Sequence, residues 1–352
     1  MRTHAPLGMT LAVALVAGAL GGGGVGCKGR FRLAADARFA EQIAMAETFA
    51  CARMKDGSAR CWGANESGEL GDGTREARSE STLVTAASHV TAVAAGERHA
   101  CALGNDGAVV CWGAGETGAA VATHASVIAV GARHACAIVD GGAVRCWGAD
   151  DAGQVAGASG VHGAIAITAR GDATCVIDAD HRVACWGRVP GRAPSDVAFA
   201  RVEGLADVKD VALGETHACA VRAFGGVACG GKNDEGQIGD GSFTDHPLPV
   251  EVANLDTPAK RIALGRRHSC ALLANGTVHC WGANAASQLA DGTKAHHASP
   301  ELVQGAFDVT GLEAAGDASC ILFTDGSARC WGGLALPKTD VVPVTVPMEV
   351  RW

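Results

Sequence analysis

Short apolar stretches, separated by glycine- and aspartate-rich turns, recur along most of the chain. Residues 90–113, VTAVAAGERHACALGNDGAVVCWG, show the pattern: an apolar run, a Gly turn, then two apolar arms around Asn-Asp-Gly. Asp-Gly or Asn-Gly between two such arms is typical of a tight β-hairpin, because these residues tolerate positive φ. The pattern therefore predicts an apolar strand followed by a hairpin, in an all-β chain.

Two cysteines ten positions apart mark each hairpin, and the hairpin occurs seven times. The pairs are Cys51 and Cys61, Cys101 and Cys111, Cys136 and Cys146, Cys175 and Cys185, Cys219 and Cys229, Cys270 and Cys280, and Cys320 and Cys330. Successive copies begin 35 to 51 residues apart, a period typical of propellers, solenoids and arrays.

The paired cysteines face each other in the predicted hairpins, which favours one disulfide in each. A zinc site is the alternative, because four copies place a His two residues before the first Cys: His99, His134, His217 and His268. The other three copies have Phe49, Ala173 and Ala318 there and keep both cysteines. We therefore predict seven disulfides, no metal, and histidines that hydrogen-bond within the inner strands.

The segments after the hairpins complete a four-stranded unit. Three copies carry a fuller loop, at residues 64–74, 232–242 and 283–293, and a Pro- and Val-bearing stretch follows some loops, as at 246–252. Short strands at this spacing fit the blades of a propeller. The copies ending at Cys111, Cys146 and Cys185 lack the loop, so we expect their blades to be trimmed at the outer edge.

The motifs G-x-x-H-x-C-A-L, C-W-G and G-Q-L-G-D-G-T resemble those of the RCC1-like repeat family, named for the regulator of chromosome condensation. The resemblance runs from about residue 38 to 350 and implies a seven-bladed β-propeller; the cysteine-rich form resembles an exported bacterial branch. One copy departs from the pattern, with Gly230 where the others have Trp. The chain ends in a Pro-Val stretch without a further hairpin, so we expect residues 341–350 to pair into the first blade and close the ring.

The first residues resemble a bacterial lipoprotein signal, with Arg2, an apolar stretch at 7–20 and then GVGC. The predicted organisation is a signal peptide at 1–26, a short linker at 27–37 and the propeller at 38–352. Cys27 is the odd one of 15 cysteines and, if acylated, would be the membrane contact. An ordinary cleaved signal with an unmodified Cys27 is the alternative. We expect an exported cell-envelope protein, an outer-membrane lipoprotein or, without acylation, a secreted one.

The formal net charge of -8 argues against nucleic acid as a partner, because phosphate binding needs a basic surface. No G-x-S-x-G, H-E-x-x-H or Walker motif is present, so we predict neither catalytic residues nor a cofactor. We expect a monomeric binding or scaffold protein, whose partner is a protein or an envelope component. The alternatives are an inhibitor of an extracytoplasmic enzyme, similar to the propeller-type β-lactamase inhibitor, a nucleotide-exchange factor, and a propeller lyase or glycosidase.

Two rings of loops could bind a partner. We expect the CWG tryptophans to pack between blades, rather than to form exposed platforms for carbohydrate. The hairpin tips form one ring, and the turns before the hairpins form the other, which is the candidate binding face. Its residues are Glu97, Arg98, Arg133, Asp172, Glu215, Arg266, Arg267 and Asp317. Mixed charge of this kind is also typical of an ordinary solvated surface.

Overall fold

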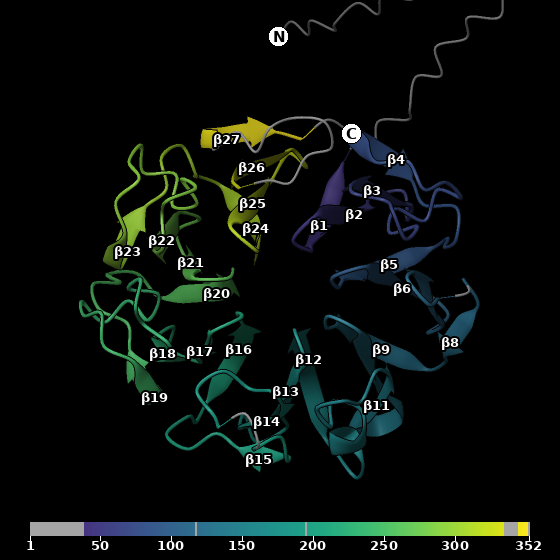
Figure 1. Ribbon diagram of the computed structural model, residues 1–352, viewed down its shortest axis with the longest axis horizontal. Coiled ribbons are helices and arrows are strands. Elements are labelled where there is room, and N and C mark those ends of the chain that lie inside the picture. Colours follow the sequence, from purple (N-terminus) through teal and green to yellow (C-terminus); the bar gives the residue numbers. More distant parts are fainter. Residues whose placement is uncertain (1–38, 117, 194–195, 334–343, 351–352) are drawn as a thin grey trace, which may run out of the picture. The chain divides into compact units, whose positions relative to one another are not determined.

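The computed structural model describes residues 39–116, 118–193, 196–333 and 344–350. The predicted signal peptide 1–26, Cys27 and the linker 27–37 lie outside the described residues. The described residues form seven antiparallel sheets around a common axis, which confirms the all-β, seven-bladed propeller (Figure 1). We number these sheets blade 1 to blade 7 in chain order.

The strands of every blade follow one another outward in chain order. The innermost strands are β1 (Ala40–Met45), β5 (Val90–Ala95), β9 (Ala125–Val130), β12 (Ala164–Arg170), β16 (Val208–Leu213), β20 (Ala259–Leu264) and β24 (Val309–Ala315). The second strands are β2 (Phe49–Met54), β6 (His99–Gly104), β10 (His134–Val139), β13 (Ala173–Asp178), β17 (His217–Arg222), β21 (His268–Leu273) and β25 (Ala318–Phe323). The third strands are β3 (Ala59–Gly63), β7 (Val109–Gly113), β11 (Ala143–Gly148), β14 (Val183–Gly187), β18 (Val227–Gly231), β22 (Val278–Gly282) and β26 (Ala328–Gly332).

The outermost strands differ between blades, as the missing loops predict. They are β4 (Arg78–Leu83), β8 (Ala120–Ala122), β15 (Ala200–Arg201), β19 (His246–Glu251), β23 (His297–Leu302) and β27 (Val344–Glu349). Blade 2 has a three-residue outer strand, blade 4 a two-residue one, and the described part of blade 3 has three strands. Helix in the described part of the chain comprises two short 3-10 turns, η2 (Asp140–Gly142) and η3 (Ala156–Ala158), and none there is long and apolar enough to cross a membrane.

The expectation that residues 341–350 pair into the first blade is wrong. β27 pairs with β26 of its own blade, and blade 1 has its own outer strand, β4. The sequence of β4, RSESTL, carries neither Pro nor Val, so its pattern did not mark it as an outer strand. A Pro-Val stretch thus belongs to the blade whose hairpin precedes it.

Packing between blades 7 and 1 closes the ring instead. Ile43 and Met54 of blade 1 share one buried cluster with Leu322 of blade 7. The N–H of Ala40 donates to the carbonyl of Gly326, the tip of the seventh hairpin, at 3.2 Å. Val90 makes the same contact to Gly57 at 2.8 Å, so the closing junction repeats a contact that blades 1 and 2 make.

All seven predicted cysteine pairs are disulfides in the structure. Each pair joins residues directly opposite in the hairpin register, with Cα atoms 4.0–4.1 Å apart. Each closes a loop of 11 residues, which corresponds to about 3 kcal/mol in the chain-entropy treatment of the unfolded state. The cross-links are local, so each one holds a single hairpin and leaves the contact between blades to packing.

The layers between blades are built from the disulfide of one blade and the tryptophan of the next. Four tryptophans are at most 3% exposed and donate their indole N–H to a loop carbonyl of the preceding blade, at 2.8–2.9 Å. The pairs are Trp112 to Glu69, Trp186 to Gln154, Trp281 to Gln237 and Trp331 to Gln288. The prediction that the CWG tryptophans pack between blades is confirmed for these four, and their buried rings cannot serve as platforms for carbohydrate.

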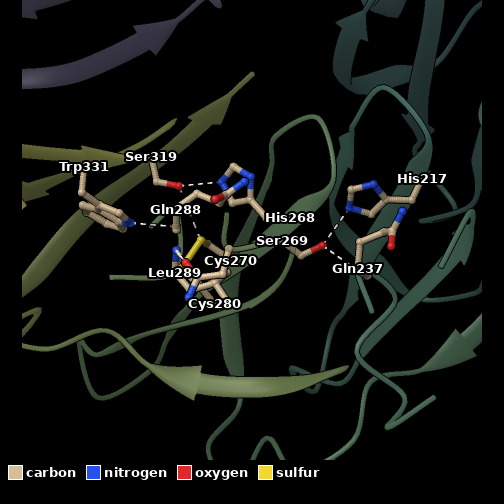
Figure 2. The surroundings of a disulfide bond; sticks show 11 residues. His217, Gln237, His268, Ser269, Cys270, Cys280, Gln288, Leu289, Ser319 and Trp331 are labelled. Atoms are coloured by element: carbon tan, nitrogen blue, oxygen red, sulfur yellow. Dashed lines mark hydrogen bonds between the residues drawn. A yellow bond between two sulfur atoms is a disulfide. The ribbon is translucent and has the colours of Figure 1, made fainter. Parts of the chain in front are cut away.

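Three of the four motif histidines hydrogen-bond to the next blade, not within their own sheet. The Nε2 atoms of His134, His217 and His268 lie 2.7–2.8 Å from the hydroxyls of Thr174, Ser269 and Ser319. Figure 2 shows two of these contacts beside the disulfide Cys270–Cys280. Ser269 also donates to the carbonyl of Gln237 at 2.8 Å. Its hydroxyl therefore accepts from His217, which places the proton of that imidazole on Nε2.

The glycine of the G-x-x-H motif makes room for the histidine. A Cβ atom built on Gly265 would lie 2.1 Å from Cε1 of His268 and 2.6 Å from the carbonyl oxygen of Gly316. The same holds at Gly131, 2.2 Å from the ring of His134. The copies without the histidine have Ala46, Arg170 and Ala315 at the glycine position, which fits this steric reason.

Candidate functional site at the mouth of the central channel

The turns between first and second strands bring two rings of residues to one end of the propeller. The inner ring, four residues before the first Cys of each blade, is Glu47, Glu97, Ala132, Gly171, Glu215, Arg266 and Gly316. The outer ring, one residue further on, is Thr48, Arg98, Arg133, Asp172, Thr216, Arg267 and Asp317. Adjacent turns are hydrogen-bonded: Ala132 N–H donates to Gly171 O, and Arg266 N–H to Gly316 O, both at 2.7 Å. At these two junctions the neighbouring turns are therefore held together by the backbone.

A cluster of four charged side chains joins four blades at this mouth. Arg266 lies 2.8 Å from a carboxylate oxygen of Glu47, 3.2 Å from Glu215 and 3.6 Å from Asp317. The four side chains are 34–42% exposed, so the cluster is accessible from solvent. The sequence identified three members and missed Glu47. Counting four positions back from Cys51, as in the other copies, would have found it.

Two carboxyls of this cluster have pKa values displaced in opposite directions. Burial, and then the hydrogen bond with Glu47, raises the pKa of Glu215 to about 7. The hydrogen bond with Glu215 and the Arg266 guanidinium lower the pKa of Glu47. The pair therefore shares a proton near neutral pH, because two carboxylates in contact do not both ionise readily. The charge of the mouth consequently depends on pH.

Arg170 lies below this mouth, inside the channel, and was not singled out from the sequence. Its guanidinium donates to carbonyl oxygens of Ala314 at 2.9 Å, Leu264 at 3.3 Å and Met45 at 3.4 Å. These acceptors come from three other blades, so one side chain from β12 spans the channel. A cavity of about 70 Å³ separates Arg170 from the charged cluster at the mouth. Its lining includes Glu47, Glu97, Glu215 and Arg170.

The channel below Arg170 is a cavity of about 200 Å³ lined by all seven innermost strands. Its polar side chains pair between neighbouring blades. Glu313 lies 2.5 Å from Arg261, and Asp210 accepts from the Ile262 N–H at 2.9 Å. Burial raises the pKa of both Glu313 and Asp210. These partners satisfy the channel side chains from within the ring, so their evident role is to join blades.

The outer-ring arginines lie over the loops and away from the channel mouth. Arg98 donates to the Ser67 hydroxyl at 2.6 Å, and Arg267 lies 3.2 Å from Glu235 and 3.6 Å from Asp234. Arg133 pairs with Asp151, and Asp172 lies 3.9 Å from Arg188. The structure thus divides the predicted ring into a central cluster and a belt of solvent-exposed ion pairs. Within the described residues, no group of three or more His, Cys, Asp or Glu side chains could hold a metal ion.

These features define a closed propeller of seven repeats with one charged mouth. Family models of the RCC1 repeat match several of these repeats. One model of the regulator of chromosome condensation (RCC1) repeat matches residues 56–103 and 225–272, and a second matches 90–118, 126–154 and 259–288.

Curated relatives match this chain over short stretches. The chain is 30% identical over 97 residues to the ultraviolet-B receptor UVR8 of Arabidopsis thaliana. It is 37% identical over 94 residues to the probable E3 ubiquitin-protein ligase HERC6 of Homo sapiens. The stretches cover 27% and 26% of this chain, and 22% and 9% of the relatives. The chain therefore matches less than a quarter of either relative's length.

Solved propellers match most of the chain. Prp20p of Saccharomyces cerevisiae superposes with a TM-score of 0.69 at 17% identity, over 84% of this chain and 83% of that one. Human WBSCR16 superposes with a TM-score of 0.68 at 18% identity, over 78% of this chain and 84% of that one. At these identities the likeness shows the fold.

Proposed function

We propose that the protein is an exported, lipid-anchored propeller that binds another protein or an envelope component and has no chemistry of its own. The observation that carries this proposal is the charged mouth, where turns locked by backbone hydrogen bonds present Glu47, Glu215 and Arg266 to solvent. A rigid, preorganised surface loses little entropy on binding. RCC1-repeat propellers generally mediate protein–protein interaction. Yeast Prp20p, for example, binds Gsp1p and histones.

The cysteines support the proposed compartment. Seven disulfides indicate an oxidising environment outside the cytoplasm. Cys27, at the end of the signal-like segment, would be the acylated membrane contact of a monomeric protein. The variant Cys27→Ser should move from the membrane to the soluble fraction. Unchanged partition would show that Cys27 is not the anchor.

Pull-down from envelope extract of the source organism tests the proposed binding. The bait is the chain carrying Cys27→Ser. The rim variant, named for the inner and outer rings of turns, adds Arg98→Glu, Arg266→Glu and Arg267→Glu, which reverse one charge in the mouth cluster and two in the outer ring. We expect the rim variant to recover at least tenfold less of the captured partner. The control is Lys209→Glu, an exposed charge at the start of β16, at the other end of the ring. Equal recovery by all three proteins would exclude the rim as the binding face.

Inhibition of an extracytoplasmic enzyme is the second candidate, favoured by exposed aromatic side chains. Phe243, in the loop between β18 and β19, is 56% exposed, and Phe224, at a hairpin tip, is 89% exposed. Aromatic side chains often anchor interfaces of this kind. Dose-dependent inhibition of a purified envelope hydrolase, weakened by Phe243→Ala, would support this candidate over a scaffold.

A further inference from the structure

The junction between blades 4 and 5 lacks the tryptophan that fills the same place at other junctions. Blade 5 carries Gly230 there, opposite Ala218 in the hairpin register. Blade 4 also lacks the loop that supplies the acceptor carbonyl and a buried Leu or Ile, such as Leu70 or Ile238 elsewhere. Both halves of the contact are therefore missing at one junction.

A cavity of about 260 Å³ occupies this place. Its floor is the disulfide Cys175–Cys185 of blade 4 with Ala218 and Ala220 of blade 5, and its walls include Val189, Val202, Leu205 and Pro249. An apolar protein cavity of roughly 150 Å³ binds benzene, so the space is large enough for a two-ring aromatic group. The side chain of Leu248 at its edge is 60% exposed, which leaves an apolar entrance.

The other junctions show which group fits against these walls. At blades 5 and 6 the equivalent layer holds Trp281, packed on the disulfide Cys219–Cys229 and fully buried. Its indole N–H donates to a carbonyl at 2.9 Å. The wall across from Gly230 is likewise a disulfide flanked by aliphatic side chains. Asp196 and Glu203 also line the cavity and offer carboxylate acceptors for an indole N–H.

The geometry points to a docking site for a tryptophan side chain of a partner protein, inserted between blades 4 and 5 where this chain has Gly230. The partner's indole takes the place that Trp112, Trp186, Trp281 and Trp331 fill from within the chain at their own junctions. The inference rests on the proposed protein-binding function and names the side chain that the partner supplies. A buried aromatic anchor in a preformed pocket is typical of interface hot spots.

Calorimetric titration of the full chain carrying Cys27→Ser with indole and N-acetyltryptophanamide tests the site. We expect one saturable site per chain, and at least tenfold weaker binding in Gly230→Trp, which fills the cavity from within. A Cβ atom at residue 230 would lie 3.2 Å from the backbone of Leu248. Because this contact crowds the backbone in Gly230→Trp, a second variant leaves residue 230 unchanged. It is Leu248→Asp, a change at the exposed entrance, which should also weaken binding. Gly226→Trp, at an exposed position four residues earlier, is the matched control and should bind as the parent does.

Equal binding by parent, Gly230→Trp and Leu248→Asp would overturn the site, as would no saturable binding to the parent. The envelope pull-down separates the site from the proposed function. A partner recovered equally by parent and Gly230→Trp would overturn the docking role while leaving the protein-binding function in place. Capture of no partner by the parent, with indole bound in the cavity, would count against the proposed function.

Discussion

Ser269 links blades 5 and 6 through two buried hydrogen bonds, and its removal tests the energetic role of that link. It accepts from Nε2 of His217 and donates to the Gln237 carbonyl, both at 2.8 Å, and all three residues are 0% exposed (Figure 2). In Ser269→Ala the Gln237 carbonyl keeps the Trp281 indole. The Nε2–H of His217 is left without an acceptor. The Nδ1 atom of the same ring already has no hydrogen-bond partner among the described residues.

The magnitude follows from these contacts. Loss of the bond to the Gln237 carbonyl costs about 1 kcal/mol, and the buried His217 donor, left without an acceptor, costs a further ~2 kcal/mol. Ser269→Ala should therefore lower the free energy of unfolding by about 3 kcal/mol by this estimate. In the background His217→Ala the orphaned donor is absent, and the same change should cost only about 1 kcal/mol. The expected coupling between the two residues is about 2 kcal/mol.

Urea denaturation of the four proteins, with disulfides oxidised, measures this coupling. The double variant is structurally reasonable, because the junction of blades 4 and 5 has Ala173 and Ala218 at these two positions. Ser67→Ala, on an exposed contact to Arg98, is the control and should change stability by less than about 0.5 kcal/mol. Additive effects of Ser269→Ala and His217→Ala, within about 0.5 kcal/mol, would refute the reasoning.

Three further predictions concern pH, packing and the chain end. Burial lowers the pKa of His217 and His268 to about 3, against 6.5 for an ordinary histidine. Between pH 6.5 and 3 the unfolded chain binds protons that the native chain excludes, so stability should fall on acidification by about 1.4 kcal/mol per pH unit for each residue. Urea titrations at pH 7, 6 and 5 should show a shallower slope in His217→Ala, and an unchanged slope would contradict the burial argument. Gly265→Ala should cost about 3 kcal/mol in thermal denaturation because its Cβ meets His268 and the Gly316 carbonyl. Gly226→Ala, at an exposed position, is the control, and a similar loss there would contradict this steric reason. Deleting residues 344–352 should expose β26 as an edge and increase light scattering on heating while the ring stays closed; loss of the folded ring would show that β27 is needed for closure.

The local part of this structure could be predicted from the sequence. Hairpin register depends on a turn and two short arms, so cysteines ten apart were sufficient to infer the disulfides, as with Cys51 and Cys61. The number of blades followed from counting copies, and the trimmed blades from missing loops. Of the candidate site, counting back from each Cys identified Glu215, Arg266 and Asp317 as residues of one ring of turns.

Apart from the tryptophans, the contacts that join one blade to another were decided by the tertiary structure. Glu47 and Arg266 are separated by 219 residues along the chain, and only closure of the ring brings them together. Closure itself was misjudged from the sequence, because packing of β1 on blade 7 leaves no periodic pattern, whereas a Pro-Val stretch does. The same limit applies to His217 with Ser269, 52 residues apart, and to the cavity at Gly230. Each depends on which faces of two blades meet, and this is set by side-chain packing across the ring, not by the local preferences that a sequence pattern reports.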